Sequence, residues 1–162
     1  MSGTIPGLSI GDKSFEMSRT FDAEPQLVFE LWTDPKYMSL WWGIKGATNP
    51  ICELDVRPGG KWRIDMRTSG GETYTSQGEY LEVVKDRLLV FTDVPDETAM
   101  PGAQPTINTV RFERDGEQTK VILEARFASN ADRDLRLQLG VQQGISQSLD
   151  RLAELIARLN SA

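Results

Sequence analysis

The sequence has 162 residues, 39% hydrophobic and 26% charged, as in an ordinary globular domain. Its net charge of −6 argues against a surface for nucleic acid or an anionic membrane, because phosphate binding needs clustered Lys and Arg. Histidine is absent and Cys52 is the only cysteine, which excludes His-based triads, His metal sites and an internal disulfide. We therefore expect no metal and no cofactor, and we assign no catalytic residue.

The N-terminal residues contain three glycines and little periodicity, which predicts a flexible arm over residues 1–13. They also lack the basic region and apolar run of a secretory signal. No stretch approaches the ~20 apolar residues of a membrane span. We expect one domain over residues 14–162 and a cytoplasmic location.

The chain then begins with one strand and two short helices. Apolar and polar residues alternate from Phe15 to Phe21, which predicts a strand with one buried face. Pro25 suits the first position of a helix, and apolar residues follow it at helical spacing until Thr33-Asp34-Pro35 stops the helix. A second short helix is predicted from Pro35 to about Leu40.

Beyond Gly46 the pattern changes to strands separated by turns. The clearest alternation is Trp62, Ile64 and Met66 against charged neighbours. Three prolines and a glycine make residues 95–105 a loop. The six predicted strands cover residues 48–56, 62–67, 72–84, 87–93, 106–114 and 119–127.

The last segment, from about Arg133 to Leu159, carries an apolar stripe at steps of three and four and predicts one long helix. Gly140 could instead mark a break between two helices. Short turns between successive strands favour an antiparallel sheet, whose apolar face needs this helix as a cover. The expected fold is α+β: a helix-grip fold in which a curved antiparallel sheet of about seven strands wraps around a long C-terminal helix.

Several motifs follow one another along the chain: Phe21–Pro25, Val28-Phe29, Trp32–Pro35, Trp41–Gly43, Asp55–Trp62, Gly78–Val83 and Ser148–Ala153. Their sequences and order resemble the START-like (SRPBCC, helix-grip) superfamily, in the branch of bacterial homologues of the activator of heat-shock-protein-90 ATPase. The resemblance covers about Ser14 to Leu159 and implies a ligand-holding cavity between sheet and helix. Many relatives carry Gly-Trp where this chain has Gly144-Ile145, which implies a differently shaped cavity wall.

Large apolar side chains are the candidates for contact with a ligand. The four tryptophans can serve as core and lid packing, as lining of an apolar pocket, or as both. Trp41-Trp42, at the end of the short helices, is the expected gate. The predicted ligand-binding residues are Trp32, Trp41, Trp42, Trp62, Met66, Tyr74, Phe91, Val141 and Ile145.

The polar residues give weaker signals. The strand carboxylates, Asp65 and Asp93 among them, are expected on solvated faces, and Asp65 lies opposite in phase to Trp62. Arg151 is expected on the outer face of the long helix. Cys52 is expected to be a small buried apolar group.

Three functions stay open on this basis. The leading hypothesis is a binding protein for a small hydrophobic or amphipathic ligand. The alternatives are a polyketide cyclase/aromatase-like enzyme, which the lack of histidine disfavours, and a chaperone-interaction module like the ATPase activator. A homodimer contact through the outer helix face is also left open.

Overall fold

The computed structural model describes residues 5–98 and 100–161. Within them, eight strands form an antiparallel sheet in the order β1-β2-β8-β7-β6-β5-β4-β3. Their bounds are β1 Leu8–Gly11, β2 Ser14–Phe21, β3 Thr48–Leu54, β4 Lys61–Arg67, β5 Thr73–Val84, β6 Leu88–Asp93, β7 Thr106–Asp115 and β8 Gln118–Arg126. The described residues of the predicted loop, 95–98 and 100–105, contain no strand, as predicted.

The additional strand is β1, which lies in the segment expected to be a flexible arm. That expectation is wrong for Leu8–Gly11, because β1 pairs antiparallel with β2, Leu8 opposite Met17. The first four residues of the expected arm lie outside the described residues.

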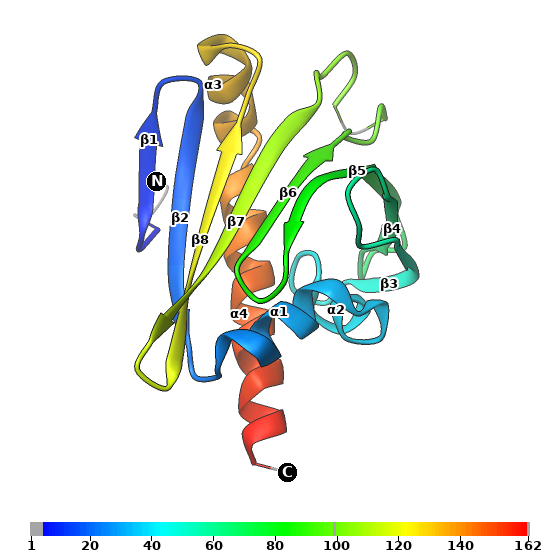
Figure 1. Ribbon diagram of the computed structural model, residues 1–162. Helices are drawn as coiled ribbons and strands as arrows, with labels where there is room; N and C mark the ends of the chain where they lie inside the picture. The colour runs from blue at the N-terminus through cyan, green and yellow to red at the C-terminus, as the bar shows by residue number, and fades with distance from the viewer. Residues whose placement is uncertain (1–4, 99, 162) are drawn as a thin grey trace.

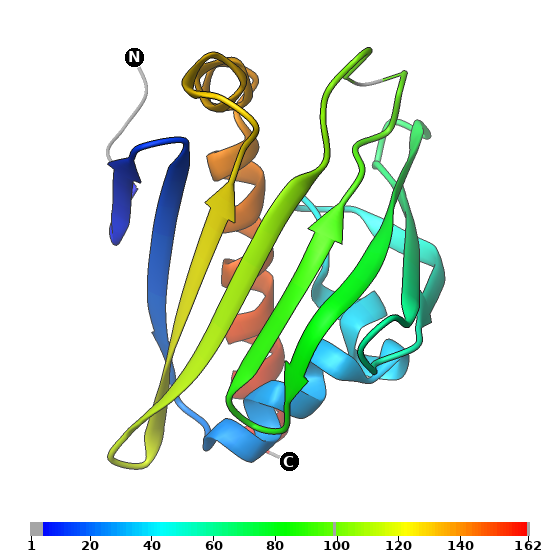
Figure 2. The same cartoon turned by 45° about the horizontal axis from the view of Figure 1, so that its top comes forward.

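Four helices complete the described chain: α1 Pro25–Thr33, α2 Pro35–Trp41, α3 Asn130–Gln138 and α4 Val141–Asn160. Helix α4 lies along one face of the sheet, and α1 and α2 lie at one end of it (Figure 1). Helix α3 and the C-terminus are at opposite ends of α4 (Figure 2). This arrangement confirms the predicted helix-grip fold.

The C-terminal helical segment is interrupted, as the alternative reading of Gly140 allowed. Gly140 has φ +83°, in the left-handed region, and separates α3 from α4. A residue with a side chain would be strained in this conformation, which glycine adopts readily. The apolar stripe of the sequence continues across the break, although the helix itself does not.

The sheet curls because β5 changes partners along its length. Its first half pairs with β4 and its second half with β6, with a register shift between Tyr80 and Glu82. At Gly78 a Cβ atom would lie 1.8 Å from the Thr92 carbonyl oxygen, so only glycine allows this approach. The β3–β4 end consequently bends round toward α2 (Figure 1).

Strand β3 forms one edge of the sheet and ends at Leu54, two residues before the expected end. Pro50 lies within it, and the register with β4 shifts between Thr48 and Ile51. Proline is tolerated in a sheet at such an edge because it has no N–H to donate.

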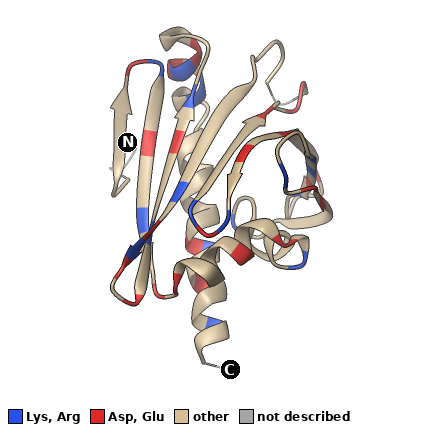
Figure 3. Ribbon diagram, viewed as in Figure 1, with Lys and Arg blue, Asp and Glu red and all other residues tan. Residues whose placement is uncertain are grey.

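The core lies between the sheet and the helices. The buried residues of α4 are Ser148, Leu149, Leu152, Leu155 and Ile156. They face alternate residues of the central strands, such as Val121, Leu123 and Ala125 on β8. On the ribbon, Lys and Arg are interspersed with Asp and Glu, notably on α3 and the strand ends (Figure 3).

Candidate functional site

A cavity of about 330 Å³ lies between the sheet and α4. Phe91, Asn108 and Ala125 line it from β6, β7 and β8, where they face one another across the ladder. Val141, Ile145 and Leu149 line it from α4. This is the place where the family resemblance implied a cavity.

One part of the wall is aromatic. The rings of Trp32 and Trp41 pack edge to face with centroids 4.8 Å apart, and those of Trp41 and Trp42 lie 6.0 Å apart. Trp41 is fully buried, and its Nε1 donates a hydrogen bond to the Leu31 carbonyl at 2.8 Å. Trp42 is only half-buried, so of the expected gate pair it is the more accessible.

The structure brings eight of the nine predicted residues together around this cavity. They are Trp32, Trp41, Trp42, Met66, Tyr74, Phe91, Val141 and Ile145. Trp62 is the exception: it faces a much smaller adjoining space, where its Nε1 donates to the Thr92 carbonyl at 3.0 Å. Contact of these residues with a ligand stays a prediction.

The rest of the wall contains polar residues that the sequence analysis did not single out as ligand contacts. Asp93, Thr106, Asn108 and Arg136 all line the cavity. Asp93 lies opposite Thr106 across the β6–β7 ladder, two pairs along from Phe91 opposite Asn108 and on the same face of the sheet. An apolar wall thus adjoins a small polar group.

Arg136 is 4% exposed and its guanidinium is held on several sides. It donates to Thr106 Oγ1 at 3.0 Å and to the Gln104 carbonyl at 2.6 Å, and its Nε lies 3.3 Å from Asp132 Oδ1. Its guanidinium carbon also lies 5.4 Å from the centroid of the Phe127 ring. Its charge is therefore compensated mainly by Asp132.

Asp93 is in a different situation, and the expectation that it is solvated is wrong. Burial raises the pKa of its carboxyl from 3.8 to about 6, an effect that the positive charge of Arg136 partly offsets. No hydrogen bond to this carboxyl comes from the described residues, although it forms part of the cavity wall. Asp93 shares strand phase with the buried Leu89 and Phe91, a signal that could have identified it.

Asp65 was correctly placed on the outer face but is not solvated. It is 8% exposed, accepts hydrogen bonds from Arg63 at 3.1 Å and from Thr75 Oγ1 at 2.8 Å, and does not line the cavity. The hydrogen bond from Arg63 is the main reason that its pKa is lowered. Its role is in the structure of the outer face.

The loop between α2 and β3 is fastened to α4, and this corrects the expectation that Arg151 is merely solvated. The hydroxyl of Ser148 accepts from the Gly43 N–H at 2.9 Å. Arg151 donates to carbonyl oxygens at the end of α2 and along the loop that follows it, at distances from 2.8 to 3.2 Å: those of Leu40, Trp42, Gly43, Ile44 and Ala47. Because Trp42, Gly43 and Ile44 line the cavity, these contacts fix one wall.

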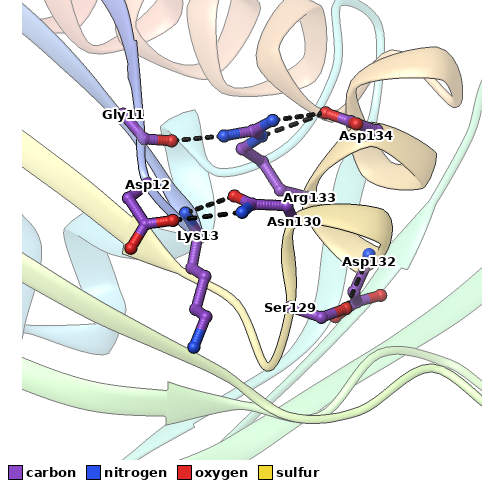
Figure 4. A network of polar contacts seen from close by, with 8 residues as sticks. All are labelled: Gly11, Asp12, Lys13, Ser129, Asn130, Asp132, Arg133 and Asp134. Carbon is purple, nitrogen blue, oxygen red and sulfur yellow. Dashed lines mark hydrogen bonds and ion pairs between the residues drawn. The ribbon is translucent and has the colours of Figure 1, made fainter.

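Helix α3, which carries Arg136, is fastened to the β1–β2 turn (Figure 4). Asn130 accepts from the Lys13 N–H at 2.7 Å and donates to Asp12 at 3.0 Å. Arg133 donates to the Gly11 carbonyl. The N-terminal strand pair therefore helps to position the helix that carries the buried guanidinium.

Cys52 is poorly suited to act as a nucleophile. Burial raises the pKa of the Cys52 thiol to about 11, which disfavours the nucleophilic thiolate. The described residues contain no group of three or more Cys, Asp or Glu arranged to hold a metal ion. None of the helices described here is long and apolar enough to cross a membrane.

Comparison with known proteins places the chain in a family. The model of the family "Activator of Hsp90 ATPase homolog 1-like protein" matches residues 22–157, whereas no curated protein matches. Solved structures with this fold include NE0264 from Nitrosomonas europaea, with 21% identity, a TM-score of 0.81 and coverage of 92% of this chain and 97% of that one.

Two further solved structures have the same fold. A protein from Arthrobacter aurescens has 20% identity, a TM-score of 0.84 and coverage of 96% of this chain and 93% of that one. The AHSA1 protein from Silicibacter pomeroyi has 23% identity, a TM-score of 0.75 and coverage of 89% and 97%. At these identities the structures show the fold alone, and the family model shows membership. The chain belongs to the Activator of Hsp90 ATPase homolog 1-like family.

Proposed function

We propose that this protein binds a small hydrophobic or amphipathic molecule in the cavity between the sheet and α4. The observation that carries the proposal is the cavity itself, about 330 Å³ in volume and walled largely by aromatic and aliphatic side chains. Pockets for small molecules usually measure roughly 300–1,000 Å³ and combine such walls with a few polar groups. Family membership supports a domain of the ligand-binding type.

The packing around the cavity supports the same function. Unfilled volume in a protein interior costs about 24 cal/mol per Å³, so stability alone would favour larger side chains in the wall. Instead, Gly144 and Ala125 line the cavity, and a Cβ on Gly144 would make only an ordinary contact at 3.8 Å, to Ile44. Small residues here preserve space that a ligand would fill.

A cyclase/aromatase-like enzyme is the second candidate, and the raised pKa of Asp93 favours it. Acid–base catalysis would also need a second inward group within hydrogen-bond reach of the first. The described side chains provide no such partner for the Asp93 carboxyl. Binding is therefore the better-supported function.

A chaperone-interaction module would need a contiguous exposed patch. Large exposed apolar residues on the sheet include Ile51, Leu81 and Ile107, which lie on β3, β5 and β7. Strands β4 and β6 separate these three positions. Their placement gives the chaperone alternative no particular support.

The test uses a probe that is uncharged at pH 7.5, N-phenyl-1-naphthylamine, whose fluorescence rises in apolar surroundings. Ile145→Trp should fill part of the cavity and weaken binding of the probe at least tenfold. Ala157→Trp, at an exposed position of the same helix, is the matched control and should leave binding unchanged. Native mass spectrometry of freshly purified protein should show a retained small molecule in the wild type and less of it in Ile145→Trp.

No probe binding and no retained molecule would refute the proposal. Equal weakening by the two tryptophan substitutions would place the binding site elsewhere. Light scattering on the same samples would test the homodimer hypothesis, which rests only on the outer face of α4.

A further inference from the structure

The polar part of the cavity wall contains a carboxylate, that of Asp93, which has no hydrogen bond to the described residues. Asp93 ends β6 on the same face as Phe91, and both side chains line the cavity. The nearby Asn108 is 8% exposed and lines the cavity, and its side-chain amide has no hydrogen bond to the described residues. An ionised carboxylate in such a place gains substantially from a donor.

The neighbouring positive charge does not supply that donor. The terminal guanidinium nitrogens of Arg136 donate to Thr106, the Gln104 carbonyl and Asp132, and its Nε has no hydrogen bond to the described residues, so none of its N–H groups donates to Asp93. Asp132 lies within ion-pair distance of Arg136, whereas Asp93 does not. The charged and titratable groups around Asp93 are thus the Arg136–Asp132 pair on α3, Asp96 in the following loop and Tyr74 on β5.

The charges of this group do not cancel. Arg136 and Asp132 offset each other, which leaves Asp93 and Asp96 as negative groups in the wall. Asp96 accepts from the Thr75 N–H at 2.7 Å and from the Thr98 N–H at 2.8 Å. Asp93 is the carboxylate that a ligand in the cavity can reach without breaking a protein hydrogen bond.

We propose that the cavity selects apolar molecules that carry a protonated amine, with the ammonium donating to Asp93 and the apolar body against the tryptophans. This inference rests on the proposed function and specifies the class of ligand. A carboxylate-bearing ligand is disfavoured because its charge would lie beside Asp93, while Arg136 already has its own anionic partner. Asn108 offers a second acceptor, its side-chain oxygen, on the adjacent strand.

The test compares three probes that share one ring system: 2-naphthylmethylamine, 2-naphthylmethanol and 2-naphthoate. Isothermal titration calorimetry at pH 7.5 should show the amine binding at least tenfold more tightly than the alcohol and the acid. Asp93→Asn should abolish this preference by weakening the amine about tenfold or more, with little effect on the alcohol. Asp115→Asn, the same substitution in an exposed hairpin, should change neither affinity.

A measurement on the wild type keeps the test independent of how the variant folds. Because burial raises the pKa of Asp93 to about 6, only about a tenth of this carboxyl is ionised at pH 5. Affinity for the amine should therefore fall about tenfold between pH 7.5 and pH 5, while affinity for the alcohol stays constant.

The outcomes separate the two proposals. If the acid binds most tightly, or the alcohol as tightly as the amine, the amine proposal is overturned while cavity binding stands. The same holds if N-phenyl-1-naphthylamine binds and the naphthyl amine does not. If neither that probe nor any naphthyl compound binds, the proposed function fails as well.

Discussion

Replacing Asp93 by asparagine should stabilise the protein. Burial raises the pKa of this carboxyl from 3.8 to about 6, so the folded state holds its proton more tightly than the unfolded chain does. At about 1.4 kcal/mol for each pH unit, ionised Asp93 lowers the free energy of unfolding by about 3 kcal/mol above pH 7. The neutral amide of asparagine carries no such cost, so Asp93→Asn should recover up to this amount.

The pH dependence gives the sharper test. Because the folded-state pKa is the higher one, the cost is present above about pH 6 and disappears as pH falls toward 4. Urea unfolding followed by tryptophan fluorescence should therefore show a gain of up to about 3 kcal/mol for Asp93→Asn at pH 7.5 and about 0.5 kcal/mol at pH 4. Asp115→Asn is the control. A variant less stable than wild type at pH 7.5, or a gain independent of pH, would refute this reasoning.

Three further substitutions test the packing around the cavity. Gly140→Ala should lower the free energy of unfolding by about 1–2 kcal/mol, because Gly140 has a positive φ. Gly144→Ala, inside α4, should raise the free energy of unfolding by up to about 1 kcal/mol. Thermal unfolding of the two variants should therefore shift in opposite directions. Trp41→Ala should lower the free energy of unfolding by about 3–5 kcal/mol, because Trp41 is fully buried. Trp42→Ala should lower it clearly less but weaken probe binding more, because Trp42 is only half-buried. Similar losses of stability in the two variants would contradict this difference in burial. Arg151→Lys should lose about 1–3 kcal/mol in urea unfolding, because an ammonium cannot reach the same set of carbonyl oxygens; an unchanged midpoint would show that the loop holds itself.

The fold could be predicted from the sequence because the spacing of its apolar residues reflects which side chains are buried. Trp62, Ile64 and Met66 alternate along β4, and the stripe from Leu149 to Ile156 runs along α4, as expected from the spacing. Strand β1 was missed because it is only four residues long and its side chains are mostly exposed. The break at Gly140 was left as an alternative because a continuous stripe does not distinguish one helix from two.

The polar residues of the site were harder to predict for a physical reason. Arg136 is buried by Thr106, Gln104 and Phe127, which come from other parts of the chain. Helical periodicity placed Arg151 away from the core, and it is the loop after α2 that covers it. Trp62 has the expected strand phase, but the close approach of β5 to β6 at Gly78 directs it to a neighbouring space.

The two edges of the open sheet bear on how the protein behaves at high concentration. An unpaired strand invites another chain to add to the sheet, which is a common route to aggregation. On β3, Pro50 and the register shift beside it interrupt the row of N–H groups that an incoming strand would need. At the other edge β1 offers only four residues, too short a template for stable pairing. The same open sheet that curves around the cavity can thus stay free of intermolecular strands.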